Sequence, residues 1–324
     1  MNVLVNVKRA AMVGLGTLAT ALLVSCGGGG DQVEPFVPTR LLVFGDEISS
    51  IQDVNSNGQG RKYNVNALAA DNLTLDCTTN PIWVQYLSAS YGLVLPACNP
   101  NGLQNLTSRS YALPGQLATD VAAQVTQHLA SSSFSETDLV TVLAGANDIL
   151  AQYGQYPTIS ETAARANLEA AAEQLAAQVN RIANAGGRVL IATVPDLGLS
   201  PYAIAQKAAN TDTDRAALLS RLTSYFNVRL RREILNDGTR IGLLLADELV
   251  QVVVKFPATY GLTNVISPLC DTALAATVDQ CTSLTLVSGG TTGTYLWADD
   301  RRLGPAGHLR LGQAAASRAA NNPF

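Results

Sequence analysis

The 324-residue sequence is poor in charge, in histidine and in long apolar runs. Only 14% of its residues are charged, against roughly a quarter in an average soluble protein, and the net charge is −4. It has no block or stripe of Lys and Arg that would neutralise a phosphate backbone, so we expect no nucleic-acid partner. With two histidines and no Cys-x-x-Cys pair, it offers no zinc-site pattern, and we expect neither a metal nor a cofactor.

The main apolar run lies near the N-terminus and is too short to cross a membrane. It extends from Ala10 to Val24, about 15 residues, whereas a spanning helix needs ~20. Lys8 and Arg9 precede it, as in an export signal. It ends in Leu-Val-Ser-Cys at Cys26, which resembles the lipobox where a bacterial lipoprotein is cleaved and its cysteine acylated. An ordinary secretory signal that contains a cysteine is the alternative.

The lipobox interpretation divides the chain into three parts. Residues 1–26 are the signal peptide through the lipobox cysteine, 27–40 are a flexible tether rich in glycine and polar residues, and 41–324 form one domain. Acyl chains on Cys26 would anchor the protein in a membrane, since each buried CH₂ contributes ~0.8 kcal/mol. In lipoproteins of bacteria with two membranes, an Asp directly after the cysteine favours inner-membrane retention. This chain has Gly27 there, which permits the outer membrane. We therefore expect a cell-envelope lipoprotein, either in the outer membrane and periplasm or exposed at the surface.

Four cysteines remain beyond the signal segment: Cys77, Cys98, Cys270 and Cys281. An even number in an exported chain indicates disulfides, and three pairings are possible. The short-range pairing, Cys77 with Cys98 and Cys270 with Cys281, closes two local loops. Free buried cysteines are the alternative, which an oxidising compartment disfavours.

Apolar runs alternate with helical segments along the rest of the chain. Buried strands are expected at 41–44, 138–144, 188–194 and 240–246, and helices at 83–91, 117–130, 161–185, 214–235 and 305–320. Such alternation predicts an α/β fold with a parallel sheet covered on both faces. Sheets of this kind place their sites at the carboxyl ends of the strands.

Polar motifs stand at those strand ends and late in the chain. They are Gly45-Asp46-Glu47-Ile48-Ser49, Tyr111-Ala112-Leu113-Pro114-Gly115, Gly145-Ala146-Asn147-Asp148, and Asp299-Asp300-Arg301-Arg302-Leu303-Gly304-Pro305-Ala306-Gly307-His308. In order and spacing they resemble the four sequence blocks of the SGNH/GDSL hydrolases over about residues 39–318. The segments 60–63, 83–85 and 256–261 are also similar to secreted and autotransporter-linked esterases of that family. The resemblance implies a three-layer α/β/α sandwich with a flavodoxin-like parallel sheet.

The resemblance also implies roles for particular positions. In the family, the first block supplies a nucleophilic serine, the second a glycine N–H and the third an asparagine side chain to the oxyanion hole. The last block, Asp-x-x-His, supplies the base and the acid that orients it. By position, Gly115 and Asn147 match the oxyanion donors and Asp299 the orienting acid. Glu47 stands at the serine position and Arg302 at the histidine position.

Both departures affect the chemistry. The family's route needs a hydroxyl that attacks the carbonyl and a neutral imidazole that takes its proton. A guanidinium has a pKa above about 12 and no lone pair for this purpose. A glutamate has no proton to give up, and attack through its carboxylate would yield an anhydride. The serine–histidine route is therefore expected to be absent.

The two replacements match each other in charge. Serine and histidine touch in the family site, so we expect Glu47 and Arg302 to pair, with Asp299 on the other edge of the guanidinium. Gly115 N–H and Asn147 are expected to donate to Glu47 as they otherwise would to an oxyanion. A buried charge that is paired and hydrogen-bonded in this way is tolerable, whereas a lone one is costly.

Several nearby residues could in principle substitute for the serine or the histidine. A shifted nucleophile at Ser49 or Ser50 is disfavoured, because the family's turn presents only the residue after the aspartate. His308 lies six residues past Arg302, about 9 Å along a helix, and is expected to cap or pack. The remaining expectations are that His128 is a surface or C-terminal helix residue, that Asp46 and Asp148 are structural hydrogen-bonders, and that Asp300 and Arg301 are surface charges.

Two functions follow. The favoured one is an envelope lipoprotein whose ester hydrolysis is lost or strongly reduced, its cleft retained for an ester, glycan or lipid ligand. The alternative is an active carboxylic-ester hydrolase in which Glu47 activates water and Gly115 and Asn147 form the oxyanion hole. A tight Glu47–Arg302 pair favours the first and a gap with room for water the second, because a neighbouring guanidinium weakens the carboxylate as a base. We expect a monomer, attached to the membrane through Cys26.

Overall fold

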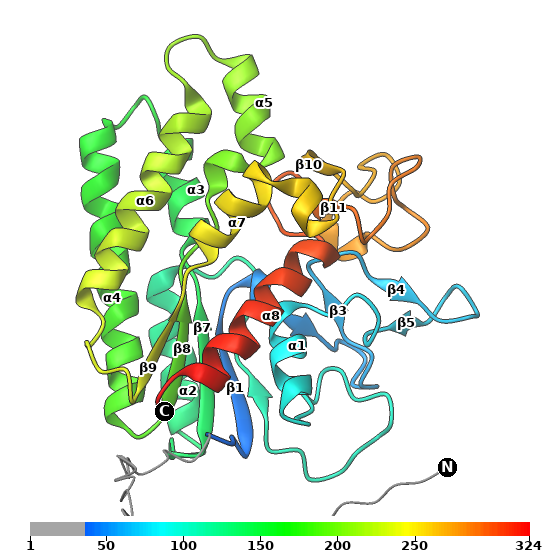
Figure 1. The fold of residues 1–324 in the computed structure, drawn as a ribbon, viewed down its shortest axis with the longest axis vertical. Helices are drawn as coiled ribbons and strands as arrows, with labels where there is room; N and C mark the ends of the chain where they lie inside the picture. Colours follow the sequence, from blue (N-terminus) through cyan, green and yellow to red (C-terminus); the bar gives the residue numbers. More distant parts are fainter. Residues whose placement is uncertain (1–35) are drawn as a thin grey trace, which may run out of the picture. The chain divides into compact units, whose positions relative to one another are not determined.

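A five-stranded parallel sheet forms the centre of the computed structural model, which describes residues 36–324 (Figure 1). Its strands lie in the order β6-β1-β7-β8-β9. Their bounds are β6 Arg109–Ser110, β1 Arg40–Gly45, β7 Asp138–Leu143, β8 Arg188–Ala192 and β9 Ile241–Leu244. Numbered along the chain within the sheet, this is the order 2-1-3-4-5 of flavodoxin-like folds. The four expected strands are confirmed and β6 is additional, while Cys26 and the signal segment lie outside the described residues.

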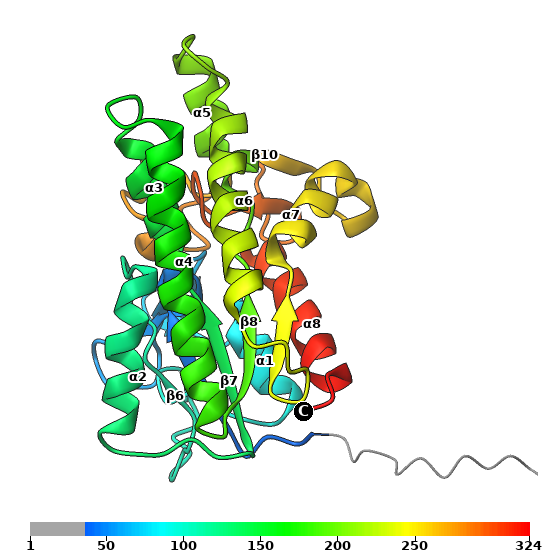
Figure 2. The ribbon, with the colours of Figure 1, turned by 90° about the vertical axis from the view of Figure 1, so that its left-hand side faces the viewer.

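Helices cover both faces of the sheet, as expected for a three-layer α/β/α sandwich (Figure 2). Successive strand residues point to opposite faces, so Leu42 and Phe44 of β1 pack in one core and Leu41 and Val43 in the other. The first core is closed by α2 Val121–Leu129, α4 Glu161–Asn184 and α6 Arg215–Glu233. The second is closed by α1 Trp83–Ser90, α7 Ala246–Lys255 and α8 Pro305–Asn321.

Three helices were not foreseen: α3 Ala146–Gly154, α5 Pro201–Ala209 and α7. A start signal for α5 is nevertheless present, because the Ser200 side chain accepts from Ala203 N and proline occupies the first helical position. The helix expected at 117–130 is divided, with a 3₁₀ turn at Ala118–Asp120 before α2. His128 lies in the last turn of α2 but is 1% exposed, so its placement at the surface was wrong.

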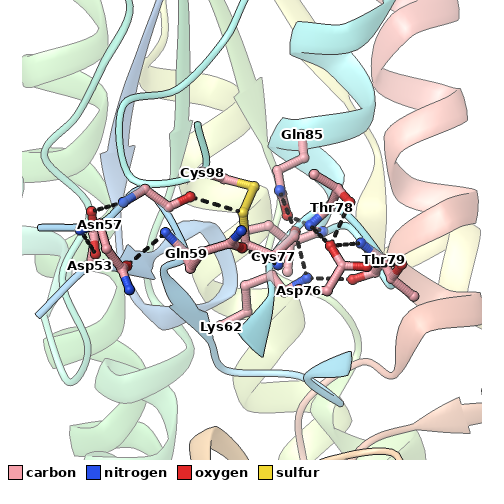
Figure 3. Close-up of a disulfide and its surroundings, with 12 residues drawn as sticks. Asp53, Asn57, Gln59, Lys62, Asp76, Cys77, Thr78, Thr79, Gln85 and Cys98 are labelled. Carbon is pink, nitrogen blue, oxygen red and sulfur yellow. Dashed lines mark hydrogen bonds between the residues drawn. A yellow bond between two sulfur atoms is a disulfide. The ribbon is translucent and has the colours of Figure 1, made fainter. Parts of the chain in front are cut away.

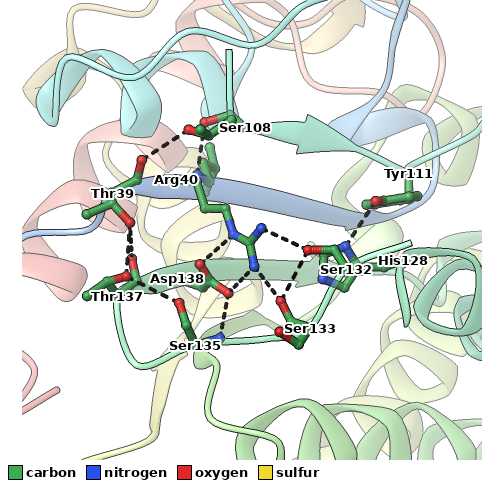
Figure 4. A network of polar contacts seen from close by, with 12 residues as sticks. Thr39, Arg40, Ser108, Tyr111, His128, Ser132, Ser133, Ser135, Thr137 and Asp138 are labelled. Carbon is green, nitrogen blue, oxygen red and sulfur yellow. Dashed lines mark hydrogen bonds and ion pairs between the residues drawn. The ribbon is translucent and has the colours of Figure 1, made fainter. Parts of the chain in front are cut away.

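An ion pair at the start of β1 and β7 holds their register (Figure 4). Arg40 and Asp138 are register partners, with Nε 2.6 Å from Oδ1 and Nη2 2.7 Å from Oδ2. Ser135 N also donates to Asp138 Oδ2, which is buried. The same register brings Gly45 beside Leu143 at the carboxyl ends, where the site residues follow.

Short paired strands and two disulfides build the region around the carboxyl ends. The pairs are β2 Ile51–Gln52 with β3 Arg61–Lys62, β4 Ala67–Leu68 with β5 Leu75–Asp76, and β10 Asn264–Pro268 with β11 Tyr295–Trp297. Cys77 is bonded to Cys98 and Cys270 to Cys281, which is the short-range pairing of the three. None of the helices within 36–324 has the length and apolarity that a membrane crossing requires.

Candidate functional site

Glu47 lies directly after β1, at the start of the 3₁₀ helix Glu47–Ser49. The turn before it needs glycine at position 45, where φ is +135° and an added Cβ would lie 1.9 Å from Leu143 O. Asp46 then caps the short helix, its Oδ1 accepting from Ile48 N at 3.1 Å. This tight strand-to-helix turn directs residue 47 toward the three segments that carry the other motifs.

Four donors surround the carboxylate of Glu47, a residue that is 6% exposed. Oε1 accepts from Arg302 Nη2 at 2.8 Å and from Arg302 Nε at 3.1 Å. Oε2 accepts from Gly115 N at 3.0 Å and from Asn147 Nδ2 at 2.9 Å. Each oxygen therefore has two hydrogen-bond donors, and the residues expected to meet around Glu47 do so.

Arg302 is shared between two carboxylates. Its Nη1 lies 2.5 Å from Asp299 Oδ2, opposite the edge that contacts Glu47. Asp299 Oδ1 accepts from the backbone N of Arg302 at 2.6 Å and of Arg301 at 3.0 Å, which fixes the turn that carries the guanidinium. Two carboxylates on one guanidinium leave this group of three side chains with a net charge of −1.

The pairing sets the protonation states of both partners. Burial alone would raise the pKa of Glu47, but Arg302, Asn147 Nδ2 and the Gly115 N–H together hold it below its ordinary value. Although burial opposes it, Asp299 and Glu47 raise the pKa of Arg302, which stays charged. Glu47 is thus an ionised carboxylate with weakened basicity.

Gly115 and Asn147, which the resemblance matched to oxyanion donors, are positioned by their own backbone surroundings. Gly115 has φ of +74°, a left-handed conformation that favours glycine and turns its N–H toward Glu47. Asn147 lies in the first turn of α3, directly beyond β7, and its Nδ2 also donates to Gln116 O at 3.0 Å. The second contact links the two loops that carry the donors.

The residues weighed as substitutes have other partners. Ser49 Oγ accepts from Trp83 Nε1 at 3.1 Å, Ser50 Oγ accepts from Gln52 Nε2, and both serines are fully buried. His308 Nδ1 accepts from Trp83 N at 3.3 Å, so this buried histidine caps α1 from α8, as expected. Because Nδ1 of His308 already accepts from Trp83 N, this nitrogen is not available as a base for residue 47.

The two aspartates of the motifs act as structural hydrogen-bonders, as expected. Asp148 Oδ2 accepts from Ala118 N at 2.8 Å and thereby joins α3 to the segment before α2. Asp46 is fully buried and accepts from Ile48 N through Oδ1. Its Oδ2 has no hydrogen-bond partner in the described part of the chain. Burial and the neighbouring Glu47 raise the pKa of Asp46 well above its usual value, which favours its neutral form.

A cavity of about 500 Å³ opens beside Arg302 and Asp299. Tyr63 forms part of one wall, and residues 270–279 form another. Asp300 and Arg301, expected as surface charges, line this cavity with side chains 48% and 37% exposed. No pattern in the sequence indicates the cavity or places Asp279 in its wall, whereas the motif at 60–63 points toward Tyr63.

The site holds a buried ion pair, but it lacks the nucleophile and base that the family's route requires. Each Glu47 oxygen is engaged by two donors, and the partner at position 302 is a permanent cation. Within residues 36–324, no group of three or more His, Cys, Asp or Glu is arranged to hold a metal ion.

One family model matches most of the chain. The model of "GDSL-like Lipase/Acylhydrolase" matches residues 41–315. A phosphatidylcholine-sterol acyltransferase of Aeromonas hydrophila is 24% identical over 232 residues, covering 70% of this chain and 64% of that relative, so the chain spans less than two thirds of its length. Solved structures include an acetylxylan esterase from Geobacillus stearothermophilus, 14% identical with a TM-score of 0.44 over 89% of this chain and 98% of that one. A GDSL-family lipolytic protein from Veillonella parvula is 12% identical, with a TM-score of 0.38 over 86% and 96%.

Proposed function

Because this chain belongs to the GDSL-like lipase/acylhydrolase family, we propose that it is a member whose ester hydrolysis has been lost or strongly reduced and whose cleft is retained for binding. The observation that supports this most is the position of the Glu47 carboxylate. It accepts from Gly115 N and Asn147 Nδ2, the two donors that an acyl oxyanion would use, and it is paired with Arg302. The side chain at the nucleophile position therefore fills the place that the reaction would need.

The charges at the site explain why hydrolysis is not expected. A substrate carbonyl can reach the oxyanion donors only if Glu47 leaves them, which would break two hydrogen bonds to a buried carboxylate. Hydrogen bonds to charged groups contribute about 1.5–3 kcal/mol each. If Glu47 did move, Arg302 would remain as a cation that can accept no proton.

The alternative, in which Glu47 activates a water molecule, finds less support. A general base needs a free lone pair within reach of the water, and a pKa near the operating pH. Arg302 Nη2 lies 2.8 Å from Oε1, and the contacts around the carboxylate hold the pKa of Glu47 below its ordinary value. The close contact between Glu47 and Arg302 therefore supports a site that does not hydrolyse esters.

The test is hydrolysis of p-nitrophenyl acetate and butyrate by the purified full-length chain and by the double variant Glu47→Ser with Arg302→His. We expect the natural chain to be silent. The double variant should gain turnover, because it restores a hydroxyl and an imidazole beside Asp299 and frees Gly115 N and Asn147 Nδ2. Turnover by the natural chain that Glu47→Gln abolishes would instead establish a glutamate-based hydrolase.

We further propose that the protein is a cell-envelope lipoprotein attached through acyl chains on Cys26, because its first 26 residues are similar to a lipoprotein signal. Radiolabelled palmitate fed to a bacterium producing the full chain should enter the protein. Cys26→Ser should remove the label and release the chain from the membrane fraction. Label that persists in Cys26→Ser would contradict the anchor.

A further inference from the structure

We propose that the cavity beside Arg302 is a binding site for a neutral oligosaccharide. The proposal rests on the proposed function, since it names the ligand that the retained cleft would hold. At about 500 Å³ the cavity lies within the range of small-molecule sites, roughly 300–1,000 Å³. Its construction and the chemistry of its lining carry the inference.

The two walls of the cavity are joined by a buried asparagine. Asn66, 2% exposed, donates from Nδ2 to Asp279 O at 3.0 Å and to Lys62 O at 3.0 Å. Its backbone N donates to Cys281 O, and Ser283 N donates to its backbone O. This single residue therefore fixes the segment that carries Tyr63 against the loop that carries Asp279.

Each wall is also stabilised from its own side. The disulfide Cys270–Cys281 closes the loop that carries Asp279, and Cys270 itself lines the cavity. Behind Tyr63, the buried Lys62 Nζ donates to Cys77 O at 2.9 Å, Thr79 O at 2.6 Å and Asn80 O at 3.0 Å, next to the Cys77–Cys98 disulfide (Figure 3). Walls tied in this way form a preorganised site, which lowers the ordering cost of binding.

The polar groups of the lining are both acceptors and donors. Asp279 and Asp300 present carboxylates, and Arg301 presents a guanidinium. Their mutual contacts are loose, with Arg61 Nη1 3.8 Å from Asp279 Oδ2 and Arg301 Nε 3.4 Å from Asp300 Oδ1. These groups keep lone pairs and N–H bonds for a ligand, and sugar hydroxyls can serve as donors and acceptors to them.

Tyr63 adds an aromatic ring to the apolar part of the lining, which also includes Pro268 and Val278. An aromatic ring offers an apolar face on which the C–H side of a sugar ring can pack, while carboxylates and guanidinium bind its hydroxyls. Arg302 Cζ lies 5.9 Å from the centre of the Tyr63 ring, so this ring borders the Glu47–Arg302 pair. A sugar bound on Tyr63 would therefore extend along the cleft next to the former catalytic position.

The lining disfavours the other ligand classes of the family's chemistry. An acyl chain would cover Asp279, Asp300 and Arg301 without offering them hydrogen bonds, which is costly. An anionic ligand would meet three carboxylates against two guanidiniums. Of these two, Arg302 is already engaged by Asp299 and Glu47. A neutral, hydroxyl-rich ligand satisfies the groups present.

Isothermal titration of the full-length chain with cellohexaose, xylohexaose and chitohexaose tests the proposal, with hexanoate and inorganic phosphate as the competing classes. We expect at least one hexasaccharide to bind with a Kd below 1 mM (about −4 kcal/mol) and neither hexanoate nor phosphate to bind. Tyr63→Ala should weaken that binding about tenfold or more, and Tyr63→Phe should retain most of it because the ring remains. Asp300→Asn should weaken it as well.

Tyr260→Ala is the matched control, because it removes an aromatic ring from a different surface groove of about 510 Å³. It should leave saccharide affinity unchanged. Failure of all three hexasaccharides to bind, binding unaffected by Tyr63→Ala, or binding of hexanoate in their place would overturn the proposal. These outcomes are separate from the hydrolysis assay, so a natural chain that cleaves esters would refute the inert site without deciding the ligand.

Discussion

Glu47 and Arg302 depend on each other at the scale of single residues. An ionised carboxylate placed alone in a buried pocket is strongly destabilising, and so is a lone guanidinium. Here the two lie 2.8 Å apart with side chains 7% and 20% exposed, and Asp299 and the oxyanion donors satisfy their remaining groups. Either replacement alone would leave a buried charge without its partner, so the two are expected to have been retained together.

This dependence predicts the stability of Glu47→Gln. The amide keeps the shape but removes the charge that Arg302 needs, so we expect a loss of about 2 kcal/mol at pH 7, measured by urea denaturation. The pKa of Glu47 is lowered in the folded state, so the unfolded chain binds this proton more readily. The contribution is therefore present above about pH 4.5 and is lost as the pH falls through the folded-state pKa.

The difference in stability between the natural chain and Glu47→Gln should accordingly shrink between pH 5 and pH 3. Glu169→Gln is the matched control, because Glu169 pairs with Arg165 on the exposed surface of α4, where such pairs contribute little. A difference that stays constant over this range would show that Glu47 does not gain stability from its charge.

At the scale of elements, His308 connects two helices of the same layer. It lies in the first turn of α8 and accepts, through Nδ1, from Trp83 N at the start of α1. The neutral ring is required in this role, since a protonated ring has no lone pair. Burial, with a smaller contribution from Lys62, lowers the pKa of His308 to about 3.

A buried neutral histidine makes folding sensitive to acid. The unfolded chain takes up this proton at about pH 6.5 and the folded chain at about pH 3, so the stability contributed above pH 6.5 is lost as the pH falls between those values. We expect the natural chain to lose about 2 kcal/mol more than His308→Asn between pH 7 and pH 5. Asparagine can still accept from Trp83 N, so the cap is retained in the variant.

Urea denaturation of both proteins at the two pH values measures this difference. His128→Asn serves as a second comparison, because burial also lowers the pKa of His128. If the natural chain and His308→Asn lose the same stability on acidification, His308 is not held neutral by the fold.

At the scale of the whole molecule, the sheet with its helices and the small core beyond the carboxyl ends of the strands are stabilised by different means. The sheet and its helices form two large apolar cores, whereas the small core around Val65, Leu269 and Val278 contains few residues beyond the Cys270–Cys281 pair. Small cores often need a covalent link because they bury little apolar surface. The Cys270–Cys281 disulfide lies in that small core, which also forms a wall of the cavity, whereas Cys77 and Cys98 pack in one of the two large cores.

Removing each disulfide should therefore have different consequences. Cys270→Ser with Cys281→Ser and Cys77→Ser with Cys98→Ser should each lower the free energy of unfolding by roughly 3 kcal/mol, slightly more for the larger Cys77–Cys98 loop. At a temperature where both variants stay folded, the Cys270/Cys281 variant should lose more saccharide affinity than the Cys77/Cys98 variant. Cys270 lines the cavity itself, whereas Cys77 supports Tyr63 only through Lys62. Thermal unfolding measures the stability of each variant, and titration with the hexasaccharides measures its affinity. Equal saccharide affinities of the two variants would mean that the Cys270–Cys281 disulfide does not shape the cavity.

The fold and the chemistry of the protein separate at this scale. The sandwich places the carboxyl ends of β1 and β7 beside one another in every member that keeps this sheet order, whatever residues follow them. In this chain residue 47 follows β1 and residue 302 precedes α8, and the two side chains form an ion pair. Function is therefore decided by the site and not by the sheet that carries it.

The sequence by itself determined the family, the parallel sheet and the residues that meet at the site. Apolar runs such as 41–44 and motifs such as Gly45-Asp46-Glu47 are local, so their periodicity and spacing can be recognised without knowing the fold. The resemblance to the family, together with the opposite charges of Glu47 and Arg302, predicted their pairing. The helices α3, α5 and α7 were missed, although Ser200 and Pro201 mark the start of α5.

Only the tertiary structure decided how the site is closed and what lies beside it. The Glu47–Arg302 contact joins residues 255 apart, and its geometry depends on how α8 packs on the sheet. The burial of His128, the choice among three disulfide pairings and the cavity between Tyr63 and Asp279 likewise depend on packing between distant segments. Local patterns specify elements, whereas cavities and long-range contacts arise from the way those elements exclude water together.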